Sequence, residues 1–136
     1  MDPLELLNER IHDFPGYATD TDRRLSDEMV RAFLGEMLAD LQVRLAPLDD
    51  QTGGQIGELM FRAGFTNQIA FRPYESIELD EAGITEIATA DGRAVDLADV
   101  AATVRKGGVA EFLGEVAAAF DARDAAMKSL AATRSS

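Results

Sequence analysis

The stretch that decides the fold is residues 25–45, which read LSDEMVRAFLGEMLADLQVRL. Steps of three and four residues separate most of its apolar side chains, which are Leu25, Met29, Val30, Phe33, Leu34, Met37, Leu38, Leu41 and Leu45. This spacing predicts a helix with one buried face. At about 1.5 Å per residue the helix is roughly 31 Å long, enough to form the spine of a small domain. Asp27 and Arg31 have the i, i+4 order of an ion pair that stabilises a helix.

A second long helix is predicted over residues 109–130. Alternating steps of four and three residues place one seam along it, made of Val109, Leu113, Val116, Phe120, Arg123, Met127 and Leu130. Such a seam is typical of helices packed in a bundle. Arg123 is the charge in this seam, and it either extends its head group to solvent or meets a carboxylate of another helix or chain. We favour the first interpretation.

A short helix is predicted at the start of the chain. Asp2 can cap it, Pro3 suits the first helical position, and Glu5 lies where its carboxylate can reach back to the cap. The Pro-Gly pair at residues 15–16 is expected to end this helix.

A further helix is predicted after the first long one. Residues 49–54 are expected to form a loop, after which helical spacing resumes at Ile56, Leu59, Met60 and Ala63. We expect this helix to break at Gly64, because glycine lowers helix propensity. Another turn or two should follow before Pro73 closes the segment.

Residues 74–97 allow two interpretations. In one, Asp80 caps a helix that ends at Gly92. In the other, Asp91-Gly92 is the turn of a β-hairpin. An isolated hairpin is unstable without a third strand, and the sequence offers none, so we favour the helix. Asp96 is then expected to cap another short helix, which residues 107–108, both glycine, should stop.

These patterns predict an all-α fold, a compact bundle of about five helices with the two long helices as its core. The alternative is an α+β fold with one small hairpin near Asp91-Gly92. No internal repeat, low-complexity tract or long linker divides the sequence. We therefore interpret residues 1–136 as one helical domain and expect residues 131–136 to form a frayed C-terminal tail.

The composition of the chain indicates which classes of partner and which cell compartment to expect. Lys and Arg number 13 against 25 Asp and Glu, a formal net charge of −12, which repels nucleic-acid phosphates and anionic lipids. We therefore expect no nucleic acid and no membrane as partners. The absence of cysteine, of an apolar run of about 20 residues and of a signal-peptide pattern near the start favours a cytoplasmic location.

Few residues suit catalysis or metal binding. Glu9 and His12 have the Glu-x-x-His spacing of di-iron bundles, but on a helix they lie away from the apolar face, so a metal there would need a second chain. The loop at residues 49–54 lacks the ligands of a calcium loop and the lysine of a phosphate-binding loop. With no cysteine, one histidine and no nucleophile turn, we predict no catalytic residues and no cofactor.

The segment from residue 59 to residue 74 stands out because it contains no acidic residue in a chain that is otherwise rich in carboxylates. Aromatic side chains and arginine are the types enriched at the centres of protein interfaces. The candidate binding residues are therefore Phe61, Arg62, Phe65, Phe71, Arg72 and Tyr74. The alternative is that the phenylalanines belong to the core.

Three functions follow in order of preference. The first is a non-enzymatic protein–protein interaction module, either a self-associating homodimer or an adaptor, that uses these six residues. The second is a binding module for a small anionic ligand, contacted by Arg62 and Arg72, or for a metal, contacted by Glu5, Glu9 and His12. The third is an enzyme that works through carboxylates.

Overall fold

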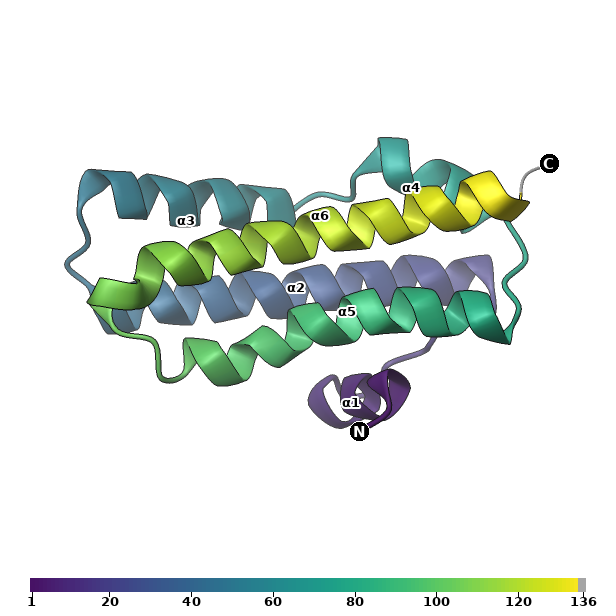
Figure 1. The fold of residues 1–136 in the computed structure, drawn as a ribbon, viewed down its shortest axis with the longest axis horizontal. Helices are drawn as coiled ribbons and strands as arrows, with labels where there is room; N and C mark the ends of the chain where they lie inside the picture. Colours follow the sequence, from purple (N-terminus) through teal and green to yellow (C-terminus); the bar gives the residue numbers. More distant parts are fainter. Residues whose placement is uncertain (135–136) are drawn as a thin grey trace.

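The computed structural model describes residues 1–134 and is helical throughout (Figure 1). The elements are α1 (Pro3–Arg10), α2 (Asp20–Leu45), α3 (Asp50–Ala63), α4 (Gln68–Glu75), α5 (Glu81–Ala101), the short 3-10 helix η1 (Lys106–Gly108) and α6 (Val109–Arg134). The all-α prediction is confirmed. The hairpin alternative is wrong, because α5 runs without interruption through Asp91 and Gly92.

Four rods form the bundle, and the fourth rod is broken. α2, α5 and α6 are continuous, whereas α3 and α4 follow one another along the remaining edge (Figure 1). Around the bundle, α2 contacts α3, α3 and α4 contact α6, α6 contacts α5, and α5 contacts α2 again. α2 and α6 are therefore diagonal partners, and α1 packs on the outer side of α5.

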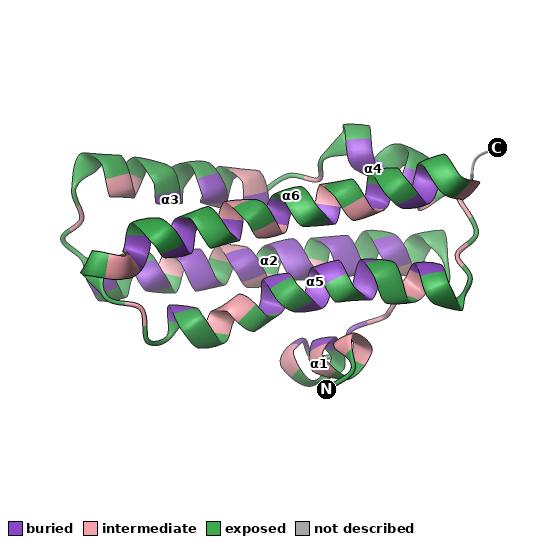
Figure 2. Ribbon diagram, viewed as in Figure 1, coloured by how far each residue is buried: buried purple, intermediate pink, exposed green. Residues whose placement is uncertain are grey.

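The two long helices bury the faces that their spacing predicts (Figure 2). Every residue of the seam on α6 is buried, including Arg123. Leu25, which belongs to the predicted stripe of α2, is instead exposed. α6 begins at Val109 as expected and continues to Arg134, so residues 131–134 of the expected tail are helical. Residues 135 and 136 lie outside the described part of the chain.

Caps define most helix starts, as expected from the sequence. Asp2 and Asp80 each accept a hydrogen bond from a backbone N–H of the first turn, at 3.2 and 2.8 Å. Asp49 does the same for α3, so most of the loop predicted over residues 49–54 is the first turn of that helix. The prediction failed there because the Asp49 cap starts the helix ahead of the glycines, and the Gly53 N–H already donates to the Asp49 carbonyl at 2.9 Å.

Three other boundaries differ from the predictions. α1 ends at Arg10 rather than at the Pro-Gly pair, because the chain turns at Asp13, whose φ is +58°. Pro73 lies inside α4, which a proline near the helix end allows at the loss of one hydrogen bond. Asp96 lies within α5 and caps no helix, and the glycines at residues 107–108 belong to η1.

Gly92 has a packing role rather than the predicted helix-ending role. It is buried in α5, where α1 crosses closely. A Cβ atom added there would lie 3.4 Å from the Cβ of Pro3 and 3.7 Å from a methyl group of Leu6. Gly92 therefore lies in the contact between α1 and α5, where an added methyl group would make ordinary van der Waals contacts.

Candidate functional site

The half of the bundle in which α2 begins holds a group of buried polar side chains, which we call the buried charge network. It joins α2, α5, α6 and the segment between α1 and α2, and consists of Tyr17, Arg23, Asp27, Arg31, Asp91 and Arg123. All six residues are less than one tenth exposed. Charges at this depth are stable only when they are paired and hydrogen bonded.

Arg123 lies at the middle of this network and is 2% exposed. Its Nε donates to Oδ1 of Asp91 at 2.6 Å, and its Nη2 donates to Oδ1 of Asp27 at 2.9 Å. Burial opposes the charged guanidinium, but the charges of Asp91 and Asp27 outweigh burial and raise the pKa of Arg123. Our preferred interpretation of a solvent-directed Arg123 is therefore wrong, and the carboxylate alternative is right.

Asp27 connects the network to the break in the fourth rod. Its Oδ2 accepts from Nε of Arg31 at 3.0 Å and from the hydroxyl of Thr66 at 2.9 Å. Arg31 also donates to the carbonyl of Ala63 at 3.0 Å and to Thr66 at 2.8 Å. The predicted i, i+4 pair is therefore present, but it is buried and fixes the end of α3 against α2.

Asp91 is shared between Arg123 and Tyr17. The Tyr17 hydroxyl donates to Oδ2 of Asp91 at 2.5 Å. Burial, together with the charge of Asp91 and this hydrogen bond, raises the pKa of Tyr17 well above its usual value. The phenol is thus held as a neutral donor.

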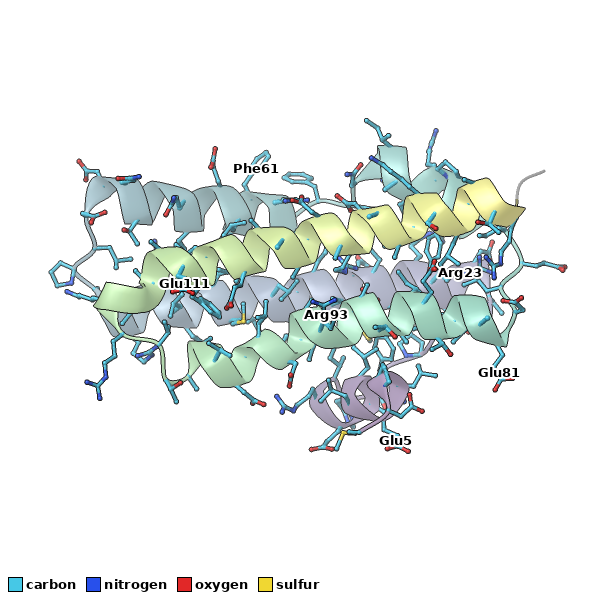
Figure 3. The ribbon with its side chains drawn as sticks, viewed as in Figure 1. Glu5, Arg23, Phe61, Glu81, Arg93 and Glu111 are labelled. Carbon is cyan, nitrogen blue, oxygen red and sulfur yellow. The ribbon has the colours of Figure 1, made fainter. Side chains whose placement is uncertain are left out.

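Arg23 anchors the end of α4 to α2 (labelled in Figure 3). Its Nη1 donates to the carbonyls of Tyr74 and Glu75, both at 3.1 Å, and of Ile77 at 2.5 Å. Its Nε donates to the carbonyl of Tyr17 at 3.1 Å. A cation at a helix C-terminus satisfies carbonyls that lack helical partners and matches the helix dipole.

The network has no group left over for a substrate. Within residues 1–134, every buried side-chain nitrogen or oxygen has a hydrogen-bond partner. Arg31 and Arg123 are paired with Asp27 and Asp91, and Arg23 is bound by carbonyls, so the geometry supports a role in fixing which helices pack together.

Sequence reasoning missed most of this network. Arg23 and Asp91 carry no periodic signal, and Asp27 and Arg31 look like an exposed pair on one helix. The one available clue was the position of Arg123 in an apolar seam.

The surface offers a second candidate site over the end of α3, the break and the start of α4. Phe61, Phe65 and Ile69 are 71%, 63% and 80% exposed, and we call these three residues the aromatic patch. The two phenyl rings lie 5.0 Å apart between centroids. Figure 3 shows Phe61 directed away from the bundle.

The six predicted binding residues divide between surface and core. Phe61, Phe65 and Arg72 are exposed, whereas Phe71 and Tyr74 are buried and pack edge to face at 5.7 Å. Ile69 was not among the candidates, although it lies four residues beyond Phe65, in the first turn of α4. Phe71 and Tyr74 are buried because one face of the short α4 packs against α6. The aromatic composition of the segment does not show which residues lie on that face.

Arg62, the remaining predicted residue, is held in place by α6. Its Nη2 donates to Asp121 at 2.7 Å and to Asp124 at 3.2 Å, and its guanidinium lies 5.0 Å from the ring centroid of Phe120. Two carboxylates beside this cation disfavour an anionic ligand there.

The predicted metal contacts do not form a cluster. His12 follows the end of α1, its imidazole is 95% exposed, and Nε2 lies 3.3 Å from Asp13. No group of three or more His, Asp or Glu side chains within residues 1–134 is arranged to hold a metal ion. None of the helices in that range combines the length and the apolar composition needed to cross a bilayer.

The two tyrosines of the chain predict a loss of stability in alkali. Burial raises the pKa of both Tyr17 and Tyr74 above the usual value near 10. Above pH 10 the unfolded chain releases both phenol protons while the folded chain keeps them. The free energy of unfolding should therefore fall by up to about 2.7 kcal/mol per pH unit.

Urea unfolding followed by circular dichroism at several pH values above 9 would measure this slope. The Tyr17→Phe variant should show about half of it, because one of the two linked protons is gone. Tyrosinate absorbance that rises around pH 10 while the helices stay intact would contradict the prediction.

Comparisons with protein-family models, with curated proteins and with solved structures found no match to this chain.

Proposed function

We propose that this chain is a protein–protein interaction module that forms a homodimer through the aromatic patch. The observation that carries the proposal is the exposure of Phe61, Phe65 and Ile69 from the end of α3 to the start of α4, with the two phenyl rings 5.0 Å apart. Covering such side chains contributes about 1.5–3 kcal/mol each when they become fully buried. Contiguous apolar patches of this kind mark interaction sites.

The patch is held in a fixed shape by contacts to α2 and α6. Arg62 binds Asp121 and Asp124, and the side-chain amide of Asn67 donates to Asp124 at 2.8 Å. From α2, Arg31 donates hydrogen bonds to the carbonyl of Ala63 and to the hydroxyl of Thr66. A surface that is ordered before binding loses less conformational entropy when a partner covers it.

Charge favours this part of the surface for self-association. Two copies of a chain with net charge −12 repel each other over most orientations. The segment from residue 59 to residue 74 contains no acidic residue, and the nearby carboxylates of Asp121 and Asp124 are paired with Arg62.

The test is the molar mass of the Phe61→Ser/Phe65→Ser variant, measured by sedimentation equilibrium over a wide concentration range. Removing two phenyl rings from each copy should weaken the dimer more than about 100-fold, because burial of each ring contributes about 1.5–3 kcal/mol. The aromatic side chains are largely solvent exposed, so the monomer should keep its stability.

Val43→Ser is the matched control, because Val43 is 79% exposed on α2 and lies outside the patch. It should dimerise like the parent chain. A parent chain that stays monomeric at every concentration, or a double variant that dimerises normally, would overturn the proposal.

A further inference from the structure

Exposed side chains of the fourth rod are spaced symmetrically about Phe65 in the sequence. Phe61 precedes it by four residues and Ile69 follows it by four. Glu58 precedes it by seven residues and Arg72 follows it by seven. All five side chains are exposed, and the two outer ones carry opposite charges.

This order follows the path of the chain in space. α3 and α4 run in the same direction along one edge of the bundle, with the break between them (Figure 1). Glu58 and Phe61 lie on α3, Phe65 lies in the break, and Ile69 and Arg72 lie on α4. The surface therefore presents, in order, an acid, three apolar groups and a base.

Such a surface is complementary to itself when one copy is turned end for end. In a two-fold dimer, residue i of one copy meets residue j of the other, and j meets i in return. A two-fold axis at Phe65 brings Glu58 of each copy to Arg72 of the other. A parallel arrangement in register would instead place two glutamates opposite each other at one end and two arginines at the other.

We propose that the dimer is antiparallel and centred on Phe65. This inference rests on the proposed function. Phe65 meets the partner's Phe65, and Phe61 packs on the partner's Ile69. Glu58 forms an ion pair with the partner's Arg72 at both ends of the interface.

Both charged groups are available for this role. Within residues 1–134 neither Glu58 nor Arg72 forms an intramolecular salt bridge, whereas Arg62 in the same segment forms two. Pairs at the rim of an interface set its register and specificity more than its total affinity. Glu58 and Arg72 are thus the residues expected to determine orientation.

The test exchanges the charges one at a time, with the whole chain. In the Glu58→Arg variant two arginines face each other at both ends of the dimer, and in Arg72→Glu two glutamates do. Each variant alone should dimerise at least about tenfold more weakly than the parent. When the two variants are mixed, both ends of the heterodimer pair an acid with a base. Native mass spectrometry of the mixture should then show the heterodimer in large excess over either homodimer.

Glu111→Arg and Arg93→Glu are the matched controls, because they make the same changes in net charge at exposed sites away from the patch (Figure 3). Their mixture should pair statistically. If Glu58→Arg or Arg72→Glu alone dimerises as tightly as the parent chain, the antiparallel register is wrong, even if the mixture favours the heterodimer. The proposed function would survive that result if Phe61→Ser/Phe65→Ser is still monomeric, and a monomeric parent chain would end both proposals.

Discussion

Replacing Arg123 by methionine is expected to lower the free energy of unfolding by about 3–5 kcal/mol at neutral pH. The guanidinium is 2% exposed and lies between the carboxylates of Asp27 and Asp91. Methionine matches the length of the stem but leaves both carboxylates buried without this cation. Thermal unfolding should show the loss as a decrease in Tm of roughly 10–20 °C.

A comparison of two further variants separates lost charge pairing from lost packing. Lys128→Met removes an exposed cation from the same helix and should change stability by less than about 0.5 kcal/mol. In Arg123→Met, the Asp91 carboxylate is left with only the neutral Tyr17 hydroxyl as a side-chain partner. The double variant Arg123→Met/Asp91→Leu removes this carboxylate, so the double variant should be more stable than Arg123→Met alone. Chemical unfolding of the set would contradict this explanation if Arg123→Met lost no more stability than Lys128→Met.

The fold was largely predictable because α2 and α6 carry strong periodic signals. Their buried faces are built from large side chains such as Leu34, Leu38 and Phe120, which stand out against polar neighbours. The face of α5 was harder to recognise, because it is made largely of small residues such as Ala94 and contains Asp91-Gly92. The Asp91-Gly92 pair is typical of a hairpin turn, but here Asp91 accepts buried hydrogen bonds and Gly92 packs against α1.

The buried charge network was not predictable from local patterns. Asp27 and Arg123 lie 96 positions apart in sequence and on diagonal rods of the bundle. The periodicity of one helix shows which face is apolar, but it does not show which charge a distant helix will supply. The aromatic patch was predicted in part, because the absence of acidic residues over residues 59–74 is visible in the sequence. The burial of Phe71 and Tyr74 was not predicted, because it depends on how α4 packs.

The bundle also depends on arginines that α2 directs at the ends of other helices. Arg23 binds carbonyls at the end of α4, Arg31 binds the carbonyl of Ala63 at the end of α3, and Arg44 binds that of Ala101 at the end of α5. α2 therefore holds both halves of the broken rod. This explains how the fourth edge of the bundle tolerates a break of four residues, from Gly64 to Asn67.

Replacing Arg23 by methionine is therefore expected to lower the free energy of unfolding by about 3 kcal/mol or more. Four carbonyls lose the same donor, those of Tyr17, Tyr74, Glu75 and Ile77. That of Tyr74 still accepts from the backbone N–H of Ile77 at 3.4 Å, and each of the others left without a partner costs about 1–3 kcal/mol. Amide hydrogen exchange should accelerate most in α4 and the segment that follows it, because these are the parts that Arg23 attaches to α2.

Arg24→Met is the matched control, because the neighbouring Arg24 makes an exposed salt bridge with Glu75 on the same segment. Exposed pairs contribute about 0–1 kcal/mol, so this variant should remain close to the parent in stability and exchange. Equal losses in the two variants would show that the buried anchor is not what holds α4. If Arg23→Met does free α4, it should also weaken the dimer without altering a residue of the aromatic patch, because Ile69 and Arg72 belong to that helix.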